Sequence, residues 1–225
     1  MDQVRLNKYL AHSFGISRRE ADHAIEQGRA RVNGRTVQLG KIIQPARDTV
    51  TLDNDTADVK PKRYTYLLLN KPVGYVCSRK QQGDAPTIYT LLPRQHHHLK
   101  VAGQLDKDSC GLVLLTDDGD TIFKLTHPKF AKEKVYHVGL NKPLKLSDKK
   151  KIEAGIELDD GVSTLKIQVI KSKMPNMYKI TMTEGRNRQI RRTFKALGYT
   201  VTHLERTGFG RYRLSQLQDK PYLHI

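Results

Sequence analysis

Cysteine is scarce in this sequence, and that shortage restricts the class of protein. Only two cysteines occur among 225 residues, Cys77 and Cys110. So few argue against a disulfide framework and fit a reducing compartment, so we expect a cytoplasmic protein. The two thiols could pair with each other, but small, partly buried free thiols are the simpler interpretation.

Long hydrophobic runs are also missing. Hydrophobic residues make up 37% of the chain, and none of their runs approaches the roughly 20 apolar residues that a transmembrane helix needs. The first five residues lack the apolar segment of a signal peptide. We therefore expect no membrane partner.

Acidic residues are too few to balance the basic ones. The chain has 40 Lys and Arg against 23 Asp and Glu, a formal net charge of +17. A surplus of that size favours polyanions, with nucleic acid the default partner. An anionic membrane is the rival, but the sequence contains no long basic amphipathic helix with an aromatic apolar face.

Residues 1–53 have the pattern of a small separate module. Apolar residues at helical spacing predict a helix over residues 6–14. Ser17 and Glu20 form a capping box that begins a second helix. Alternating residues around an Asn-Gly pair predict a hairpin over residues 30–37.

Arginines stand at two of these features, the second helix start and the hairpin. They are Arg18, Arg19 and Arg31. A solvated charged face would explain them, but free amides at a helix start also attract anions. Their order and placement resemble the S4-like RNA-binding domain, which implies that they contact RNA. Residues 54–62 are polar, contain proline and predict a linker.

Residues 63–225 predict an α+β domain built on a mixed, mainly antiparallel sheet flanked by helices. Together with the N-terminal S4-like α/β module, this gives two domains, 1–53 and 63–225. Strands are predicted over residues 64–69, 75–77, 112–115, 134–140, 165–170, 178–182 and 201–204, and helices over 118–125, 147–154 and 189–197.

Asp106 stands at a polar turn just before the apolar run Leu112–Leu115. A carboxylate at the mouth of a buried strand is held close to a low-dielectric core, which suits a nucleophile or a general base. An ordinary loop aspartate that caps its own turn is the alternative.

Four segments carry a wider resemblance. They are Leu69–Tyr75, Gly103–Asp106 with Gly111–Gly119, Lys134–Tyr136, and Glu184–Arg192. In this order they resemble the RNA pseudouridine synthases of the RsuA/RluB type, bacterial ribosomal-RNA enzymes with an S4-like domain before the catalytic domain. Four segments in one order are far more specific than any single one.

The resemblance implies isomerisation of uridine to pseudouridine in ribosomal RNA or a pre-ribosomal particle, and we expect the protein to be a monomer. The bond from ribose to the base nitrogen breaks and the base is rejoined through carbon. Since no electron or group leaves the substrate, we expect no cofactor. Asp106 aligns with the family's essential aspartate. Whether it attacks the ribose or the base, or assists elimination, stays open.

The resemblance also assigns neighbours to Asp106. Arg191 would hold its charge as an ion pair, although a phosphate contact is the alternative. Tyr136 would stack on the uracil and help to move a proton, although half-buried strand tyrosines are common. Leu204 would line the pocket, and a core leucine would look the same.

The target base of a folded RNA has to be flipped into such a pocket. The cations expected to hold phosphates during this step are Lys71, Arg186, Arg188 and Arg192. The family usually has arginine where this chain has Gln104. Gln104 keeps hydrogen bonding in the pocket and loses charge, which predicts retuned substrate binding.

Two other functions compete. A non-catalytic ribosome-assembly protein could keep the fold, but RNA binding alone does not need Asp106, Tyr136 and Arg191. A different enzyme acting on nucleic acid, by metal-dependent phosphoryl transfer, would need grouped carboxylates. An acidic group of this kind is Asp117, Asp118 and Asp120, but Asp118 is interpreted as a helix-start residue. Three adjacent histidines, 96–98, lack the spacing of a metal site. We expect no metal, and the target nucleotide stays open.

Overall fold

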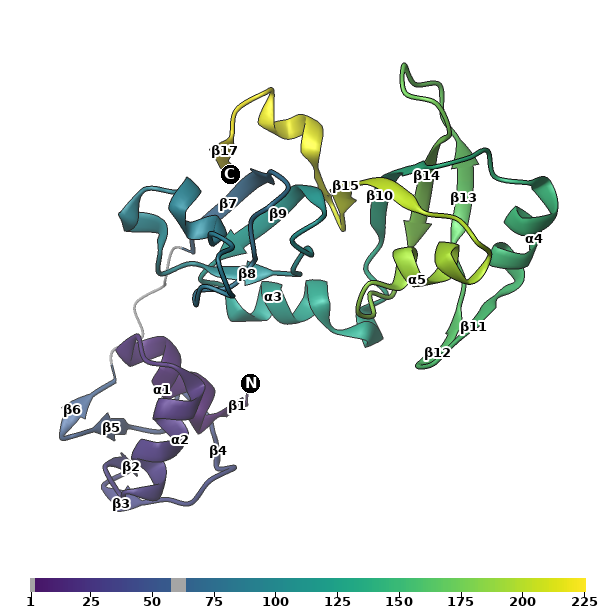
Figure 1. Ribbon diagram of the computed structural model, residues 1–225. Helices are drawn as coiled ribbons and strands as arrows, with labels where there is room; N and C mark the ends of the chain where they lie inside the picture. Colours follow the sequence, from purple (N-terminus) through teal and green to yellow (C-terminus); the bar gives the residue numbers. More distant parts are fainter. Residues whose placement is uncertain (1–2, 58–63) are drawn as a thin grey trace. The chain divides into compact units, whose positions relative to one another are not determined.

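The computed structural model describes residues 3–57 and 64–225. The chain divides into two compact units, Met1–Arg63 and Tyr64–Ile225 (Figure 1). Within the described ranges, no helix is both long and apolar enough to cross a membrane.

The N-terminal unit consists of two helices and short strands around its own apolar core. Leu6, Leu10, Ala21 and Ile25 bring the helices together in that core. The sheet order is β3-β2-β5-β6, and β1 pairs with β4. The elements are β1 (Val4–Arg5), α1 (Leu6–Phe14), α2 (Arg18–Glu26), β2 (Ala30–Val32), β3 (Arg35–Thr36), β4 (Ile42–Ile43), β5 (Val50–Leu52) and β6 (Asp55–Thr56).

Local signals in this unit act as predicted, except at its end. Ser17 Oγ accepts a hydrogen bond from the Glu20 amide at 3.1 Å, and the Glu20 carboxylate accepts one from the Ser17 amide at 2.6 Å. The predicted linker begins too early, because Asp55–Thr56 form β6 after a turn that Asp and Asn can adopt at positive φ. Residues 58–63 of that linker lie outside the described residues.

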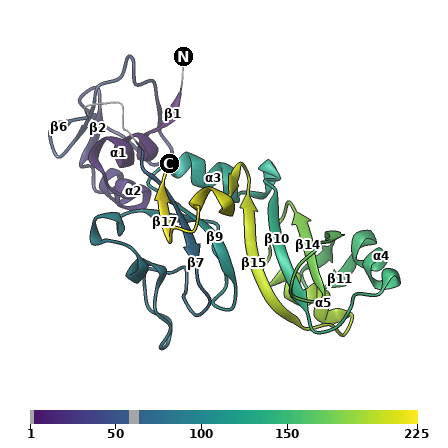
Figure 2. The same cartoon turned by 90° about the horizontal axis from the view of Figure 1, so that it is seen from above.

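The C-terminal unit is built on a nine-stranded sheet with the order β13-β14-β10-β15-β9-β7-β17, to which β8 and β16 add at β9 and β15 (Figure 2). All pairs are antiparallel except β9 with β15. The predicted α+β class is confirmed. The strands are β7 (Tyr66–Lys71), β8 (Lys100–Ala102), β9 (Cys110–Thr116), β10 (Lys134–Leu140), β13 (Lys166–Val169), β14 (Met177–Met182), β15 (Val201–Phe209), β16 (Tyr212–Arg213) and β17 (Tyr222–His224).

Both faces of the central strands are buried, which explains their continuous apolar runs. On β7, Leu67 and Leu69 pack into one core cluster and Leu68 into another. The remaining elements are α3 (Gly119–Thr126), α4 (Leu146–Ala154), α5 (Gln189–Ala196), the hairpin of β11 (Ile156–Leu158) and β12 (Gly161–Ser163), and the short 3-10 helices η1 (Ile88–Leu91), η2 (Arg94–His96), η3 (Pro128–Phe130) and η4 (Leu214–Leu217).

Two local predictions are wrong. Residues 75–77 do not form a strand: Val76 makes an isolated bridge with Thr87. The helix predicted to start at residue 147 starts one residue earlier, at Leu146, with Lys145 in the cap position. Strand β15 also extends five residues beyond its predicted end, since residues 205–209 continue the pairing with β10.

Asp118 caps α3, as the sequence predicted. Its carboxylate accepts hydrogen bonds from the amides of Asp120 and Thr121, and from the hydroxyls of Tyr66 and Thr121, each at 2.6–3.1 Å. Burial alone would raise the pKa of Asp118, but these hydrogen bonds outweigh it and the net shift is downward. The ionised carboxylate is therefore the form that stabilises the fold.

Asp118→Ala should lower the free energy of unfolding by about 1–2 kcal/mol at neutral pH, since it removes the cap. The folded pKa lies below the unfolded one, so the ionic stabilisation is present above about pH 4 and is lost as the pH falls through the folded pKa. Urea unfolding of wild type and variant between pH 7 and pH 3 checks this: the stability difference should shrink towards acid. A difference independent of pH would contradict it.

Candidate active site

Asp106 lies on the loop that joins β8 to β9, residues 103–109, called here the Asp106 loop. Its carboxylate is 33% exposed and lines a pocket of about 340 Å³. Ligand pockets of proteins begin at roughly this volume. The pocket walls also include Gln104, Tyr136, Glu184, Arg188 and Leu204.

Three cationic side chains hold the backbone of the Asp106 loop. Arg206 Nη2 donates to the Gly103 carbonyl at 2.8 Å, Arg191 Nη2 to the Asp108 carbonyl at 2.8 Å, and Lys71 Nζ to the Ser109 carbonyl. Charge-assisted hydrogen bonds are stronger than neutral ones. The loop is thus tied at both of its ends, on either side of Asp106.

Arg206 is almost fully buried beneath this loop. Its Nε donates to the Leu112 carbonyl at 2.8 Å, and its guanidinium lies 4.8 Å from the centre of the Phe209 ring. Gly103 has φ of +71°, and a Cβ there would lie 2.9 Å from that ring. Only glycine fits where the loop passes over Phe209.

Lys71 was predicted to contact RNA phosphates, and the structure places it elsewhere. Its side chain has no exposed surface, because Lys71, the last residue of β7, lies on the same face of the strand as the buried Leu67 and Leu69. Besides Ser109, its Nζ donates to the Pro72 carbonyl at 3.0 Å. Burial lowers the pKa of Lys71 below its ordinary value. Lys71 therefore binds the backbone of the Asp106 loop and does not face solvent.

The predicted ion pair between Asp106 and Arg191 needs a similar correction. Among the described residues, the ion pair to Asp106 comes from Arg188, whose Nη1 lies 3.9 Å from Oδ2. Arg191 instead donates to the carbonyls of Asp108 and Val201. Arg188 directly precedes α5 in a left-handed backbone conformation, and Arg191 lies in the first turn of that helix. Both reach the loop, and only the fold decides which guanidinium meets the carboxylate.

Tyr136 and Leu204 reach the pocket from neighbouring strands. In the register of β10 and β15, Tyr136 pairs with Arg206, and Val138 pairs with Leu204. Side chains two apart on a strand share a face, so all four lie on one side of the sheet. Tyr136 and Leu204 are both mostly buried there. Gln104 also lines the pocket, as expected, and is exposed.

Lys134 and Glu184 also line the pocket, and neither was given a role from the sequence. Lys134 Nζ donates to the Thr183 carbonyl at 3.2 Å. Burial and the nearby charge of Arg206 lower the pKa of Lys134, while Glu184 opposes them. Glu184 itself accepts hydrogen bonds from Gln189 and Arg186. Of the two pocket carboxylates, Asp106 therefore has fewer hydrogen-bonding partners among the described residues than Glu184.

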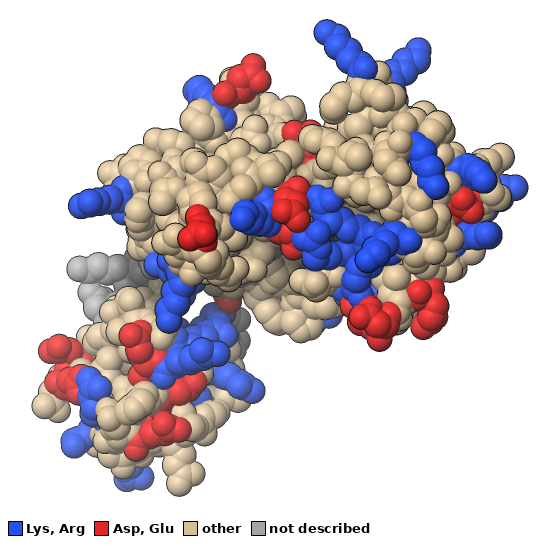
Figure 3. All heavy atoms as spheres, in the orientation of Figure 1, with Lys and Arg blue, Asp and Glu red and all other residues tan. Residues whose placement is uncertain are grey.

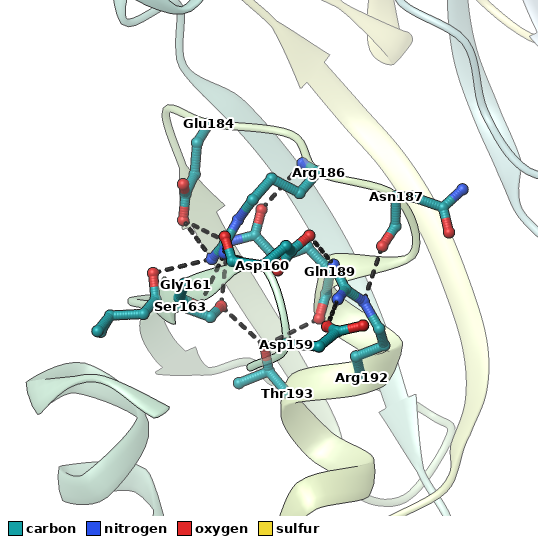
Figure 4. Close-up of polar contacts among 11 residues, drawn as sticks. Asp159, Asp160, Gly161, Ser163, Glu184, Arg186, Asn187, Gln189, Arg192 and Thr193 are labelled. Carbon is teal, nitrogen blue, oxygen red and sulfur yellow. Dashed lines mark hydrogen bonds and ion pairs between the residues drawn. The ribbon is translucent and has the colours of Figure 1, made fainter. Parts of the chain in front are cut away.

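Arg186 and Arg192 were also predicted to hold phosphates, but the hairpin of β11 and β12 engages them (Figure 4). Arg186 Nη1 donates to Asp160 Oδ1 and to the Gly161 carbonyl, each at 2.8 Å. Arg192 pairs with Asp159, and with Asp160 Oδ2 at 2.6 Å. The hydrogen bond from Arg192 lowers the pKa of Asp160.

Because these arginines pair with aspartates, the basic surface of this unit also contains acidic side chains. Figure 3 shows Lys and Arg side chains gathered over the start of α5, with acidic side chains among and beside them. Of the four predicted phosphate-binding cations here, Arg188 alone is exposed. Its side chain is 42% exposed and lies 3.1 Å from Asp108.

Comparison with known proteins decides the family. The RNA pseudouridylate synthase family model matches residues 65–196, and the S4 domain model matches residues 4–49. The chain belongs to the RNA pseudouridylate synthase family.

Its relatives cover nearly the whole chain. An uncharacterised RNA pseudouridine synthase of Aquifex aeolicus is 36% identical over 95% of this chain and 88% of its own length. The dual-specificity RNA pseudouridine synthase RluF of Escherichia coli is 38% identical, over 91% and 69%. The ribosomal small subunit pseudouridine synthase A of Escherichia coli is 34% identical, over 92% and 89%.

A solved pseudouridylate synthase shares the structure. It matches with a TM-score of 0.68 and 32% identity, over 99% of this chain and 96% of the other. The resemblance drawn from the four sequence segments is therefore confirmed.

The S4 domain of this synthase presents the three arginines that the sequence singled out. Arg18, Arg19 and Arg31 are all exposed, at the start of α2 and on β2. Arg29, which flanks the same hairpin, pairs with Asp53 instead.

The histidines at 96–98 and Asp118, on which the metal-site alternatives depended, have contacts within the protein. His97 Nε2 contacts the Leu92 carbonyl at 3.0 Å, and His98 Nδ1 contacts the Gln95 carbonyl at 2.7 Å. The buried His96 ring packs against His224. Asp118, in the acidic group, is the α3 cap.

Lys71→Met separates a positioning role from a phosphate contact. Met keeps the volume but leaves the carbonyls of Pro72 and Ser109 without their donor, so the synthase should lose about 1–3 kcal/mol of stability. Its rate should fall while the salt dependence of RNA binding stays unchanged. Lys107 is an exposed lysine of the same loop. The control variant Lys107→Met should change neither the stability nor the rate. Unaltered stability with a shallower salt slope would instead make Lys71 a phosphate ligand.

Proposed function

We propose that this synthase isomerises specific uridines of ribosomal RNA to pseudouridine, with Asp106 as the catalytic carboxylate. One observation carries the proposal: Asp106 stands on a braced loop in the pocket that Tyr136 and Leu204 line. Membership of the family supports the reaction, and the name of a relative that modifies the small ribosomal subunit supports the substrate class.

The reaction needs only rearrangement within the nucleotide. The bond between ribose C1′ and base N1 breaks, the base turns, and a bond forms between C1′ and C5. The proton on C5 leaves, and N1 gains a proton. Asp106 starts this sequence at the ribose or at the base, and Arg188 Nη1 lies 3.9 Å from its carboxylate.

Tyr136 has two roles in the proposal. Its ring stacks on the uracil, an interaction worth about 1–3 kcal/mol for each base. Its hydroxyl carries the proton that leaves C5. Leu204 lies on β15, the strand next to the one that carries Tyr136, and it closes the apolar side of the pocket.

The target nucleotide is flipped out of the RNA into the pocket. Flipping costs a few kcal/mol, and cations offset that cost by holding the phosphates. In the catalytic unit Arg188 and Lys134 line the pocket. Gln104 replaces the arginine usual in the family and supplies hydrogen bonds without charge.

The S4 domain supplies affinity rather than chemistry. Arg18, Arg19 and Arg31 hold the RNA, which raises the effective concentration of the target at the pocket. We expect the synthase to act as a monomer, on ribosomal RNA or a pre-ribosomal particle.

The test maps pseudouridine in ribosomal RNA by chemical labelling in cells that lack the endogenous gene. A site that returns with wild type and not with Asp106→Asn identifies both the reaction and the target. If no site depends on the protein while it still binds ribosomal RNA, the proposal fails and a role in ribosome assembly takes its place.

A further inference from the structure

On the face of the sheet opposite the pocket, where β9 pairs with β15, lie three side chains of the types that bind metal ions. Leu204 and Arg206 line the pocket, so His203 and Glu205 of β15 face the other way. Cys110, the first residue of β9, is the register partner of Glu205. One ligand atom from each of Cys110, His203 and Glu205 lies within 4.8 Å of the others, and all three side chains are half-buried.

We propose that Cys110, His203 and Glu205 bind a zinc ion. A thiolate, an imidazole and a carboxylate are all ordinary zinc ligands, and the thiolate with the imidazole favours zinc over magnesium or calcium. The thiolate and the carboxylate together balance the charge of the ion. Around one tetrahedral zinc the ligand atoms lie about 3.4–3.6 Å apart, so side-chain rotations of about 1 Å complete the site without moving the strands.

A second layer of contacts supports this ligand set. His137 on β10 is the other register partner of Glu205, and its Nδ1 lies 3.8 Å from Glu205 Oε2. Residues in that position orient ligating carboxylates. Lys179 on β14 pairs with His137 from the far side. The charge of Lys71 also acts on Cys110, but its ammonium donates to the carbonyls of Pro72 and Ser109.

Cys110 is a protonated thiol before it binds metal. Its Sγ donates to the Leu204 carbonyl at 3.7 Å. Burial raises the pKa of Cys110, and the charge of Glu205 raises it further. Zinc therefore displaces a proton from Sγ and replaces one weak hydrogen bond with a metal bond.

The position of the site suggests what the ion does. Strands β9 and β15 are joined by only two register pairs, Glu205 with Cys110 and Arg206 with Gly111. This short junction connects the β13-β14-β10-β15 half of the sheet to the β9-β7-β17 half. Cys110 directly follows the Asp106 loop, so a zinc ion here would fasten the junction just behind the catalytic aspartate.

The first experiment follows metal binding on the full-length protein without an affinity tag. Metal-stripped protein is titrated with cobalt(II), which substitutes for zinc and shows a thiolate-to-metal charge-transfer band in the near ultraviolet. We expect the band to saturate at one cobalt per chain and to disappear when zinc is added. Cys110→Ser should abolish the band. Cys77→Ser, which removes the other thiol, should leave it in place.

Zinc affinity and stability give a second readout. His203→Gln and Glu205→Gln should each weaken zinc binding by at least about 10-fold, and His137→Gln by less. A zinc excess of 100 times Kd should raise the unfolding midpoint of the catalytic unit by about 5 °C or more in wild type. The shift should vanish in Cys110→Ser. The double variant His97→Gln, His98→Gln removes two of the three adjacent histidines at 96–98 and should keep wild-type zinc affinity.

Three outcomes overturn the proposal: no stoichiometric zinc at micromolar concentration, binding that survives both Cys110→Ser and His203→Gln, or binding that the histidine double variant abolishes. Each readout is metal content, absorption or melting. The proposed pseudouridine activity can therefore stand or fall independently of this site.

Discussion

Asp106→Asn should lower the single-turnover rate of pseudouridine formation on the target RNA by on the order of 10⁴-fold, the usual cost of removing an essential nucleophile or base. Asn fits the same space and keeps the backbone contacts of the Asp106 loop. RNA affinity should therefore stay within a few-fold of wild type, since affinity comes mainly from phosphate contacts. Rates measured with saturating enzyme, beside filter-binding affinities, separate the two effects.

Asp108→Asn is the matched control for this experiment. Asp108 lies on the same loop, its side chain is 56% exposed, and it also contacts Arg188. The proposal gives it no chemical role, so the variant should keep most of the wild-type rate. Equal losses in the two variants would mean that loop charge, rather than the Asp106 carboxylate, limits the reaction.

Gly111→Ala should destabilise the catalytic unit by about 3 kcal/mol or more, one of the larger effects expected of a single substitution. Gly111 has φ of +99°, and a Cβ there would lie 2.5 Å from the Arg206 carbonyl oxygen and 2.8 Å from the Arg206 amide nitrogen. Backbone atoms cannot rotate away as a flexible side chain can. The variant must separate β9 from β15 at their short junction.

Thermal unfolding checks this expectation, as a midpoint about 6–12 °C lower for the catalytic unit. Gly119→Ala is the control, because its Cβ would meet nothing within 4 Å and its φ is not positive. It should leave the midpoint almost unchanged. A Gly111→Ala protein as stable as wild type would show that the junction of β9 and β15 can open at little cost.

Much of the fold could be predicted because local chemistry agrees with the final structure. The Ser17–Glu20 capping box, the Asn33-Gly34 turn and the Asp118 cap each satisfy backbone groups within a few residues. Strand β10, Lys134–Leu140, has the predicted bounds. The missed elements are short, such as β17, or depend on a distant partner, as the C-terminal half of β15 depends on β10.

The candidate site likewise has a part that the sequence predicted and a part that it did not. The positions of Asp106, Tyr136 and Leu204 in the pocket follow from motif order and from strand alternation. The partners of the cations do not. Arg186 and Arg192 meet Asp159 and Asp160, which lie about thirty residues earlier in the chain, and nothing local to α5 indicates that pairing.

The sequence by itself therefore determined the family and much of the order of the elements, and it singled out Asp106 as the expected catalytic carboxylate, because each of these rests on local motifs. Only the tertiary structure decided what the positive charges do. Lys71, Arg191 and Arg206 turn inward to backbone carbonyls of the Asp106 loop, and Arg188 is left to face the carboxylate. Charge is visible in a sequence, but the direction of a long cationic side chain depends on which faces are buried and on which carbonyls lack a donor.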